Sequence, residues 1–137
     1  VQQRGHRIDE LKNVVESKVE SITKTKDAQK FLISLGLEKE LQRVSIKKVR
    51  AGKGKNRGRK YKRKTGPLLV VSKECPLQKA ARGIEGVDIC TPNQLNAELL
   101  APGTVSGRLT IYTEDALKML ESQKLFMSKN EKSEVKK

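Results

Sequence analysis

Basic side chains concentrate in one stretch of the sequence, KKVRAGKGKNRGRKYKRK, which runs from Lys47 to Lys64. Eleven of its eighteen residues are Lys or Arg, and none is acidic. The whole chain carries a formal net charge of +14, so the other 119 residues contribute only +3. Because such a cluster repels itself, we expect its counter-charges to lie on a polyanionic partner.

The residue types of this run favour a phosphodiester backbone as that partner. Lys and Arg that meet phosphates release condensed counterions, and Arg also offers parallel donors to the phosphate oxygens. Four glycines, Gly52, Gly54, Gly58 and Gly66, have no Cβ and allow the backbone to approach a ligand. Tyr61 is the one aromatic residue of the run, and its ring could stack on an unpaired base, as RNA permits.

Other interpretations of the run have to be weighed beside this one. A disordered basic tail or a nuclear-import signal has a similar composition. However, the run is internal and leads directly into GPLLVVS, an apolar segment typical of a strand. The glycines also fail to match known nucleotide-binding loops: no Lys-Ser/Thr pair precedes a helix, and Gly52, Gly54 and Gly58 precede a strand instead of following one.

Residues that could support catalysis or metal binding are few. Cys75 and Cys90 are fifteen residues apart, and His6 is the only histidine, so we expect free thiols in a reducing compartment and no metal. Glu114 and Asp115 are best interpreted as acids in the first turn of a helix. We therefore expect no catalytic residue, no cofactor and no enzyme activity, although parallel α/β sheets often host enzymes. A third functional class, beside an RNA-binding protein and an enzyme, is a regulatory protein that binds an acidic partner through this run.

The elements that must position the run form an alternating pattern. Short β-branched segments at 68–71, 87–90 and 109–112 predict strands. Helical signals follow each of them: Pro76 with an apolar stripe, Thr91 with Pro92, and Thr113 before an amphipathic segment whose buried face takes Ala116, Leu117 and Leu120. This order predicts an α/β fold: a mostly parallel sheet with βαβ crossovers, helices on its faces and a long basic loop.

Length and composition fix the remaining organisation. We expect one RNA-binding α/β domain over 1–124, with the basic loop at 47–66, and a disordered charged tail over 125–137. A helix is predicted from 25 to 35 and a second one after Gly36, whereas 14–15 fits a short strand or a helical start equally well. No apolar run approaches the roughly 18 residues of a membrane span, and no signal peptide opens the chain, so we expect a cytoplasmic protein without a membrane.

Four segments together resemble a known family. VRAGKGKNRGRKYKRKTGPLLVVS, KAARGIEGVDI, LNAELLAPG and GRLTIYTEDALKML, in this order and spacing, are similar to the fourth ribosomal protein of the large subunit in its archaeal and eukaryotic form. The resemblance covers about residues 4 to 120. It implies a structural constituent of the large ribosomal subunit in the cytoplasm, bound to ribosomal RNA and neighbouring ribosomal proteins, with no small-molecule substrate.

The resemblance also implies which residues bind RNA. Family members carry further strands and an Arg- and Gly-rich extension toward the peptide exit tunnel, N-terminal to the matched region, whereas this chain starts at Val1. We therefore expect a partial chain that lacks this part. Backbone approach to RNA is expected at Gly52, Gly54 and Gly58. The side chains expected to contact RNA are Arg50, Lys53, Lys55, Arg57, Arg59, Lys60, Tyr61, Lys62, Arg63, Lys64 and Arg108.

Overall fold

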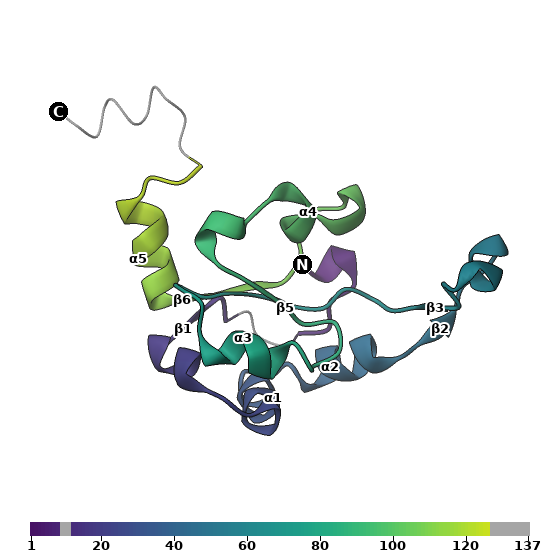
Figure 1. Cartoon of the computed structure of the whole chain (residues 1–137), viewed down its shortest axis with the longest axis horizontal. Coiled ribbons are helices and arrows are strands. Elements are labelled where there is room, and N and C mark those ends of the chain that lie inside the picture. The colour runs from purple at the N-terminus through teal and green to yellow at the C-terminus, as the bar shows by residue number, and fades with distance from the viewer. Residues whose placement is uncertain (9–11, 127–137) are drawn as a thin grey trace.

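Four parallel strands form the central sheet of the computed structural model, which describes residues 1–8 and 12–126 (Figure 1). The strand order is β1-β6-β4-β5. The strands are β1 (Val14–Val15), β4 (Leu68–Val70), β5 (Asp88–Cys90) and β6 (Thr110–Thr113). The three strands predicted downstream of the basic run are confirmed, and the ambiguous segment at 14–15 is a strand that pairs parallel with β6.

Helices cover both faces of this sheet, which confirms the predicted α/β class. The helices are α1 (Thr25–Ser34), α2 (Glu38–Ser45), α3 (Pro76–Ala81), α4 (Ala97–Leu100) and α5 (Glu114–Ser122). Figure 1 shows α1, α2 and α3 on one side of the sheet and α4 and α5 on the other. Short 3₁₀ helices complete the chain: η1 (Gln2–Arg4), η2 (Ser17–Ser21), η3 (Lys53–Arg57), η4 (Pro92–Gln94) and η5 (Pro102–Thr104).

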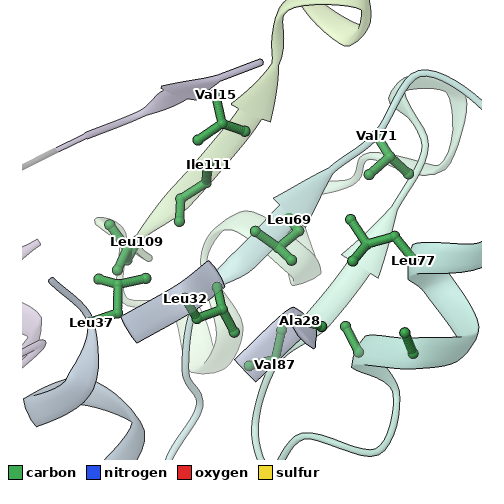
Figure 2. Packing of buried hydrophobic residues seen from close by; sticks show 12 residues of the cluster. Val15, Ala28, Leu32, Leu37, Leu69, Val71, Leu77, Val87, Leu109 and Ile111 are labelled. Atoms are coloured by element: carbon green, nitrogen blue, oxygen red, sulfur yellow. The ribbon is translucent and has the colours of Figure 1, made fainter. Parts of the chain in front are cut away.

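Alternation along β4 divides the core into two layers. Leu69 points into the larger cluster, where it packs with Leu32 of α1, Leu77 of α3 and Ile111 of β6 (Figure 2). Leu68 and Val70 point to the opposite face, toward residues of α4 and α5. Since successive side chains of a strand point to opposite faces, a strand buried on both sides must be apolar throughout, as LLVV is.

The helix predicted after Thr91 is broken into two short ones. Pro92–Gln94 forms the 3₁₀ helix η4, in which the Gln94 side chain accepts a hydrogen bond from the Thr91 backbone N–H at 3.2 Å. Asn96 then starts α4, because its side chain accepts from the Leu99 N–H at 2.8 Å. Two good capping residues so close together start two separate helices.

The start of α5 confirms the sequence prediction, but one of its apolar residues was misassigned. Thr113 caps the helix by accepting from the Ala116 N–H at 3.4 Å, and Glu114 and Asp115 occupy the first turn. Ala116 is fully buried, whereas Leu117 is 37% exposed, so its predicted burial is wrong. The inward stripe follows Ala116 and Leu120, one turn apart, and Leu117 is rotated about 100° beyond Ala116.

Within the predicted basic loop, 47–66, the chain forms an antiparallel hairpin. Strands β2 (Lys48–Val49) and β3 (Tyr61–Lys62) pair with each other, and η3 forms the tip. Figure 1 shows this hairpin projecting from the body, at the end of the molecule opposite α5. The predicted disordered tail, 125–137, lies outside the described residues except for its first two. None of the helices within 1–8 and 12–126 combines the length and apolar content that a membrane span requires.

Two apolar truncations test this packing. Ile111→Ala removes a side chain that is 1% exposed in the larger cluster, and we expect it to lower the free energy of unfolding by about 2 to 4 kcal/mol. Leu117→Ala is the matched control on the exposed side of α5, and it should cost less than about 1 kcal/mol. Urea unfolding followed by circular dichroism measures both. Equal losses for the two variants would contradict the assignment of the core.

Candidate nucleic-acid interface

Glycines shape the tip of the hairpin. Gly52 (φ 78°) and Gly58 (φ 76°) flank η3 with positive φ angles, and no atom lies within 4 Å of a Cβ added at either. The turn itself therefore requires glycine at both positions, because other residues adopt this conformation only at a cost. The two strands are held by backbone hydrogen bonds, including Arg50 N–H to Lys60 O at 2.8 Å. The hairpin is thus a locally built structure.

The hairpin places its cations at the surface. Nine of the ten side chains predicted from Arg50 to Lys64 are exposed, and Arg50 is half-buried. Arg50 Nε donates to the Arg59 carbonyl at 3.2 Å, so this side chain also bridges the two strands. At the base, Arg63 forms an ion pair with Glu85 at 2.7 Å. Most of the run thus presents positive charge outward.

Tyr61 combines an open ring with two neighbouring cations. The residue is 53% exposed on β3. The ammonium groups of Lys47 and Lys60 lie 5.9 and 5.7 Å from the ring centroid. This distance is within the range of cation–π attraction. A base stacked on this ring would have its phosphates within reach of the same Lys side chains.

Arg108 lies inside the fold and not on the hairpin. Its side chain is 1% exposed, and the guanidinium donates to the carbonyls of Gly66 and Leu99, each at 2.9 Å. It also pairs with the Asp88 carboxylate on β5. Because its donors are occupied internally, we leave Arg108 out of the interface. Gly66 is likewise buried, and its N–H donates to the Gly86 carbonyl at 3.0 Å.

A buried ion cluster supports the base of the hairpin. The Glu40 carboxylate of α2 accepts hydrogen bonds from His6 Nδ1 at 2.6 Å, the Arg7 N–H at 2.9 Å and two nitrogens of Arg43 at 2.6 and 2.8 Å. Arg43 also donates to the Thr65 carbonyl at 2.8 Å, directly after the basic run. His6 Nε2 accepts from the Leu109 N–H at 3.3 Å, which requires the tautomer protonated on Nδ1. This cluster joins four separate segments.

The protonation state of Glu40 follows from these contacts. Burial raises the pKa of its carboxyl, but hydrogen bonds from Arg43, His6 and the Arg7 backbone, together with the charge of Arg43, outweigh burial and lower the pKa from 4.5 to about 2. Glu40 is therefore ionised at neutral pH. A buried charge of this kind is retained only with partners that satisfy its lone pairs.

Sequence reasoning predicted Lys62 and Lys64 as site residues but missed Arg4, Arg7, Arg43 and Lys48, which lie near them. A cleft of about 910 Å³ beside the base of the hairpin is lined by Arg4 and Arg7 of the N-terminal segment, Arg43 of α2, and Lys48, Lys62 and Lys64 of the hairpin. Arg4 and Arg7 precede the basic run by forty residues or more in the sequence, and they are brought here by contacts of the N-terminal segment with Glu40 and with the carbonyls of Pro102 and Val105. No local pattern indicates these contacts.

The edge of the sheet where α/β proteins often bind ligands is filled by the chain itself. Glu20 of η2 accepts from the Ser72 N–H at 2.8 Å, the Ser72 hydroxyl at 2.7 Å and the Thr113 hydroxyl at 2.7 Å. Ser72 and Thr113 mark the carboxyl ends of β4 and β6, which is the usual position of such sites. The Glu20 carboxylate thus ties η2 to the sheet.

The cysteines are free thiols in unreactive surroundings. Burial raises the pKa of Cys75, and it raises the pKa of Cys90 to about 11, so the Cys90 thiol stays protonated at neutral pH. A nucleophilic or metal-binding cysteine needs the thiolate form. The described part of the chain contains no group of three or more His, Cys, Asp or Glu side chains placed to hold a metal ion.

Comparison with known proteins now gives the family. Residues 3–123 match the model of the ribosomal protein L4/L1 family. The chain belongs to this family. It is 50% identical to the large ribosomal subunit protein uL4 of Nanoarchaeum equitans over 127 residues, which cover 92% of this chain and 47% of that protein. The resemblance identified from the basic run and the downstream motifs is confirmed.

Two further archaeal relatives show the same coverage. The uL4 protein of Methanothrix thermoacetophila is 46% identical over 122 residues, which are 88% of this chain and 49% of that protein. The uL4 protein of Thermoplasma acidophilum is 47% identical over 125 residues, again 88% and 49%. The chain therefore spans about half the length of the curated relatives it matches, all of which are named as proteins of the large ribosomal subunit.

The ion cluster predicts a specific acid sensitivity. Since the pKa of Glu40 is about 2 in the folded state and near 4.5 when unfolded, its stabilisation is complete above pH 4.5 and is lost as the pH falls toward 2. This difference corresponds to about 3 kcal/mol of unfolding free energy. Urea unfolding between these pH values should show the loss in the wild type and not in Glu40→Gln. If that variant does not fold, an NMR titration of the Glu40 carboxyl in the wild type provides the test. A titration midpoint near 4.5 would contradict the lowered pKa of Glu40.

Proposed function

We propose that this chain is a structural constituent of the large ribosomal subunit and binds its ribosomal RNA through the projecting basic hairpin, Lys47–Lys64. The observation that carries the proposal is a hairpin of eleven cations, almost all exposed, on a domain of this ribosomal protein family. The related uL4 proteins are named for the large subunit. Binding would support assembly of the subunit and hence translation.

The shape of the hairpin supports contact with RNA backbones. Cations lie on both strands and on the tip, so a hairpin inserted between RNA segments would neutralise phosphates on more than one side. Lys side chains supply mobile point charges, and Arg57 and Arg59 supply planar donors that fit phosphate oxygens bidentately. Tyr61 adds a surface on which an unpaired base can stack. The α/β body then serves to hold the hairpin in place.

The partners follow from the same proposal. The chain would lie in the cytoplasmic large subunit, in contact with ribosomal RNA and with neighbouring ribosomal proteins. Its role would be structural, and it would need no cofactor, no small-molecule substrate and no membrane. Backbone approach to RNA would occur at the tip, around Gly52, Gly54 and Gly58, where the chain carries the least side-chain bulk.

Replacing the distal hairpin tests the proposal. Val49 and Tyr61 are direct partners in the ladder, so a two-residue Asn-Gly turn can join them in place of residues 50–60. This removes six cations, Arg50, Lys53, Lys55, Arg57, Arg59 and Lys60. If all six meet phosphates, the slope of log affinity against log salt for large-subunit RNA should fall by roughly 4 to 5. Filter binding between about 50 and 200 mM salt measures this slope.

The body of the protein provides the control for this replacement. The hairpin packs no side chain into either apolar cluster, so cooperative thermal melting should survive the replacement almost unchanged. Wild-type affinity itself should fall by roughly 10³ to 10⁵ over the same salt range if six to ten phosphates are contacted. A nearly flat dependence of affinity on salt, or an unchanged slope of log affinity against log salt after the replacement, would contradict the proposal.

Paired point substitutions separate the hairpin from positive charge in general. Arg57→Ala with Arg59→Ala removes two exposed cations from the hairpin, and we expect weaker RNA binding with stability changed by less than about 0.5 kcal/mol. Lys26→Ala with Lys30→Ala removes the same charge from exposed positions of α1. Only the first pair should reduce the salt slope, by roughly 2. Equal effects of both pairs would indicate binding by net charge alone.

A further inference from the structure

The cleft beside the hairpin base is built from parts of the chain that are distant in sequence. Its walls are the N-terminal segment, the end of α2, the base of the hairpin and the turn around η5. Its volume of about 910 Å³ is within the range that admits a nucleotide-sized ligand. The hairpin, which carries the proposed function, forms only one of these walls.

Arginine and glutamate side chains fix the walls relative to one another. Glu40 holds the N-terminal segment on α2, and Arg43 links α2 to the hairpin through the Thr65 carbonyl. Arg4 donates to the carbonyls of Pro102 and Val105 and so attaches the η5 turn to the N-terminal segment. The cleft is therefore held open by internal contacts before any ligand arrives, which reduces the ordering cost of binding.

Two kinds of side chain remain available at this cleft. Arg7, Lys48, Lys62 and Lys64 are exposed cations along its lining, and within the described residues their side chains make no hydrogen bond or ion pair. Ile46 and Val105 are large apolar residues that are each 56% exposed on the same lining. The cleft thus combines positive charge with uncovered apolar surface.

We propose that this cleft captures a single unpaired nucleotide of the bound RNA, with its phosphates on Arg7, Lys48 and the Lys residues of the hairpin base, and its base against Ile46 and Val105. The inference rests on the proposed function, because it adds a second contact to the same RNA. A bare phosphate would use the cations alone, whereas a nucleotide also covers the apolar residues. Single-stranded and bulged RNA offers splayed bases of this kind, and an uninterrupted duplex does not.

An acidic segment of another protein is the competing occupant. Carboxylates would pair with the same cations, but they gain little from the two exposed apolar residues. The apolar residues therefore discriminate between the two occupants, and substitutions at these positions give the sharpest test. Ile46 and Val105 are both exposed, so their replacement by Ser leaves the core intact.

The experiment compares two RNA duplexes that differ only by one bulged adenosine, with binding followed by fluorescence anisotropy. The wild type should bind the bulged RNA at least about fivefold tighter, because covering the exposed apolar surface of Ile46 and Val105 is worth that much or more. Ile46→Ser with Val105→Ser should reduce this ratio to about one and leave the affinity for paired RNA unchanged. Ile33→Ser, at an exposed apolar position of α1, is the matched control and should keep the ratio.

Cation substitutions and the hairpin replacement complete the test. Arg7→Ala with Lys48→Ala should lower the salt slope for bulged RNA by roughly 2, whereas Lys26→Ala with Lys30→Ala should not. The Asn-Gly replacement of residues 50–60 should weaken both RNAs by a similar factor and keep their ratio. A wild type without preference, or serine variants that retain it, overturns the cleft assignment while the hairpin results still support the proposed function.

Two further outcomes separate the proposals. If the Asn-Gly replacement leaves both affinities unchanged, RNA binding by the hairpin is rejected. The ratio of affinities for bulged and paired RNA in the serine variants still tests whether the cleft binds a nucleotide. Labelled polyglutamate serves as the acidic-peptide probe. The acidic-segment alternative predicts that polyglutamate binds the wild type and binds the Arg7→Ala, Lys48→Ala double variant more weakly. If this is observed, and no variant changes the ratio of affinities for bulged and paired RNA, the cleft binds an acidic protein segment and the nucleotide assignment is overturned.

Discussion

The buried carboxylate of Glu40 is the contact on which the arrangement of the hairpin and the cleft depends. Removing a carboxylate from water costs several kcal/mol, and only near-complete hydrogen bonding offsets that cost. Glu40 receives four such bonds, from His6, the Arg7 backbone and two nitrogens of Arg43. Because the donors come from the N-terminal segment and from α2 itself, one ionised group fixes the path of the first residues and the position of Arg43 beside the hairpin.

The hairpin depends on this cluster and yet remains independent of the core. Its distal part is stabilised by its own backbone ladder and by Gly52 and Gly58, whereas its orientation is set at the base by the bond from Arg43 to the Thr65 carbonyl and the ion pair of Arg63 with Glu85. Next to it, Gly66 packs so closely on the Gly86 carbonyl that a Cβ would lie 2.7 Å away. Charge presentation and folding stability therefore occupy different parts of the molecule.

The parts of this structure that sequence could predict are those determined by neighbouring residues. Hydrophobic runs and caps locate β4, β5, β6 and the start of α5, because strand and helix signals are local. Two features depend on contacts between distant segments and were not predicted: the burial of Arg108 against Asp88, and the gathering of Arg4 and Arg7 at the cleft. The burial of Leu117 was predicted wrongly for a local reason, because its position on α5 is rotated about 100° beyond Ala116. Composition cannot separate an arginine that binds RNA from one that holds the fold together.

The structure distinguishes arginines that join segments of the fold from arginines that lie exposed on the hairpin. Arg4, Arg43 and Arg108 lie outside the hairpin, and each donates to backbone carbonyls of another segment, in a way that suits a planar guanidinium with five donors. The hairpin instead carries seven Lys and four Arg, most of them exposed. Lys holds a compact charge on a flexible stem, which can follow phosphates whose positions vary but lacks the rigid, planar array of five donors with which Arg joins segments. Arginines outside the hairpin thus fix segments of the fold to one another, whereas the surface proposed to bind RNA is rich in lysine.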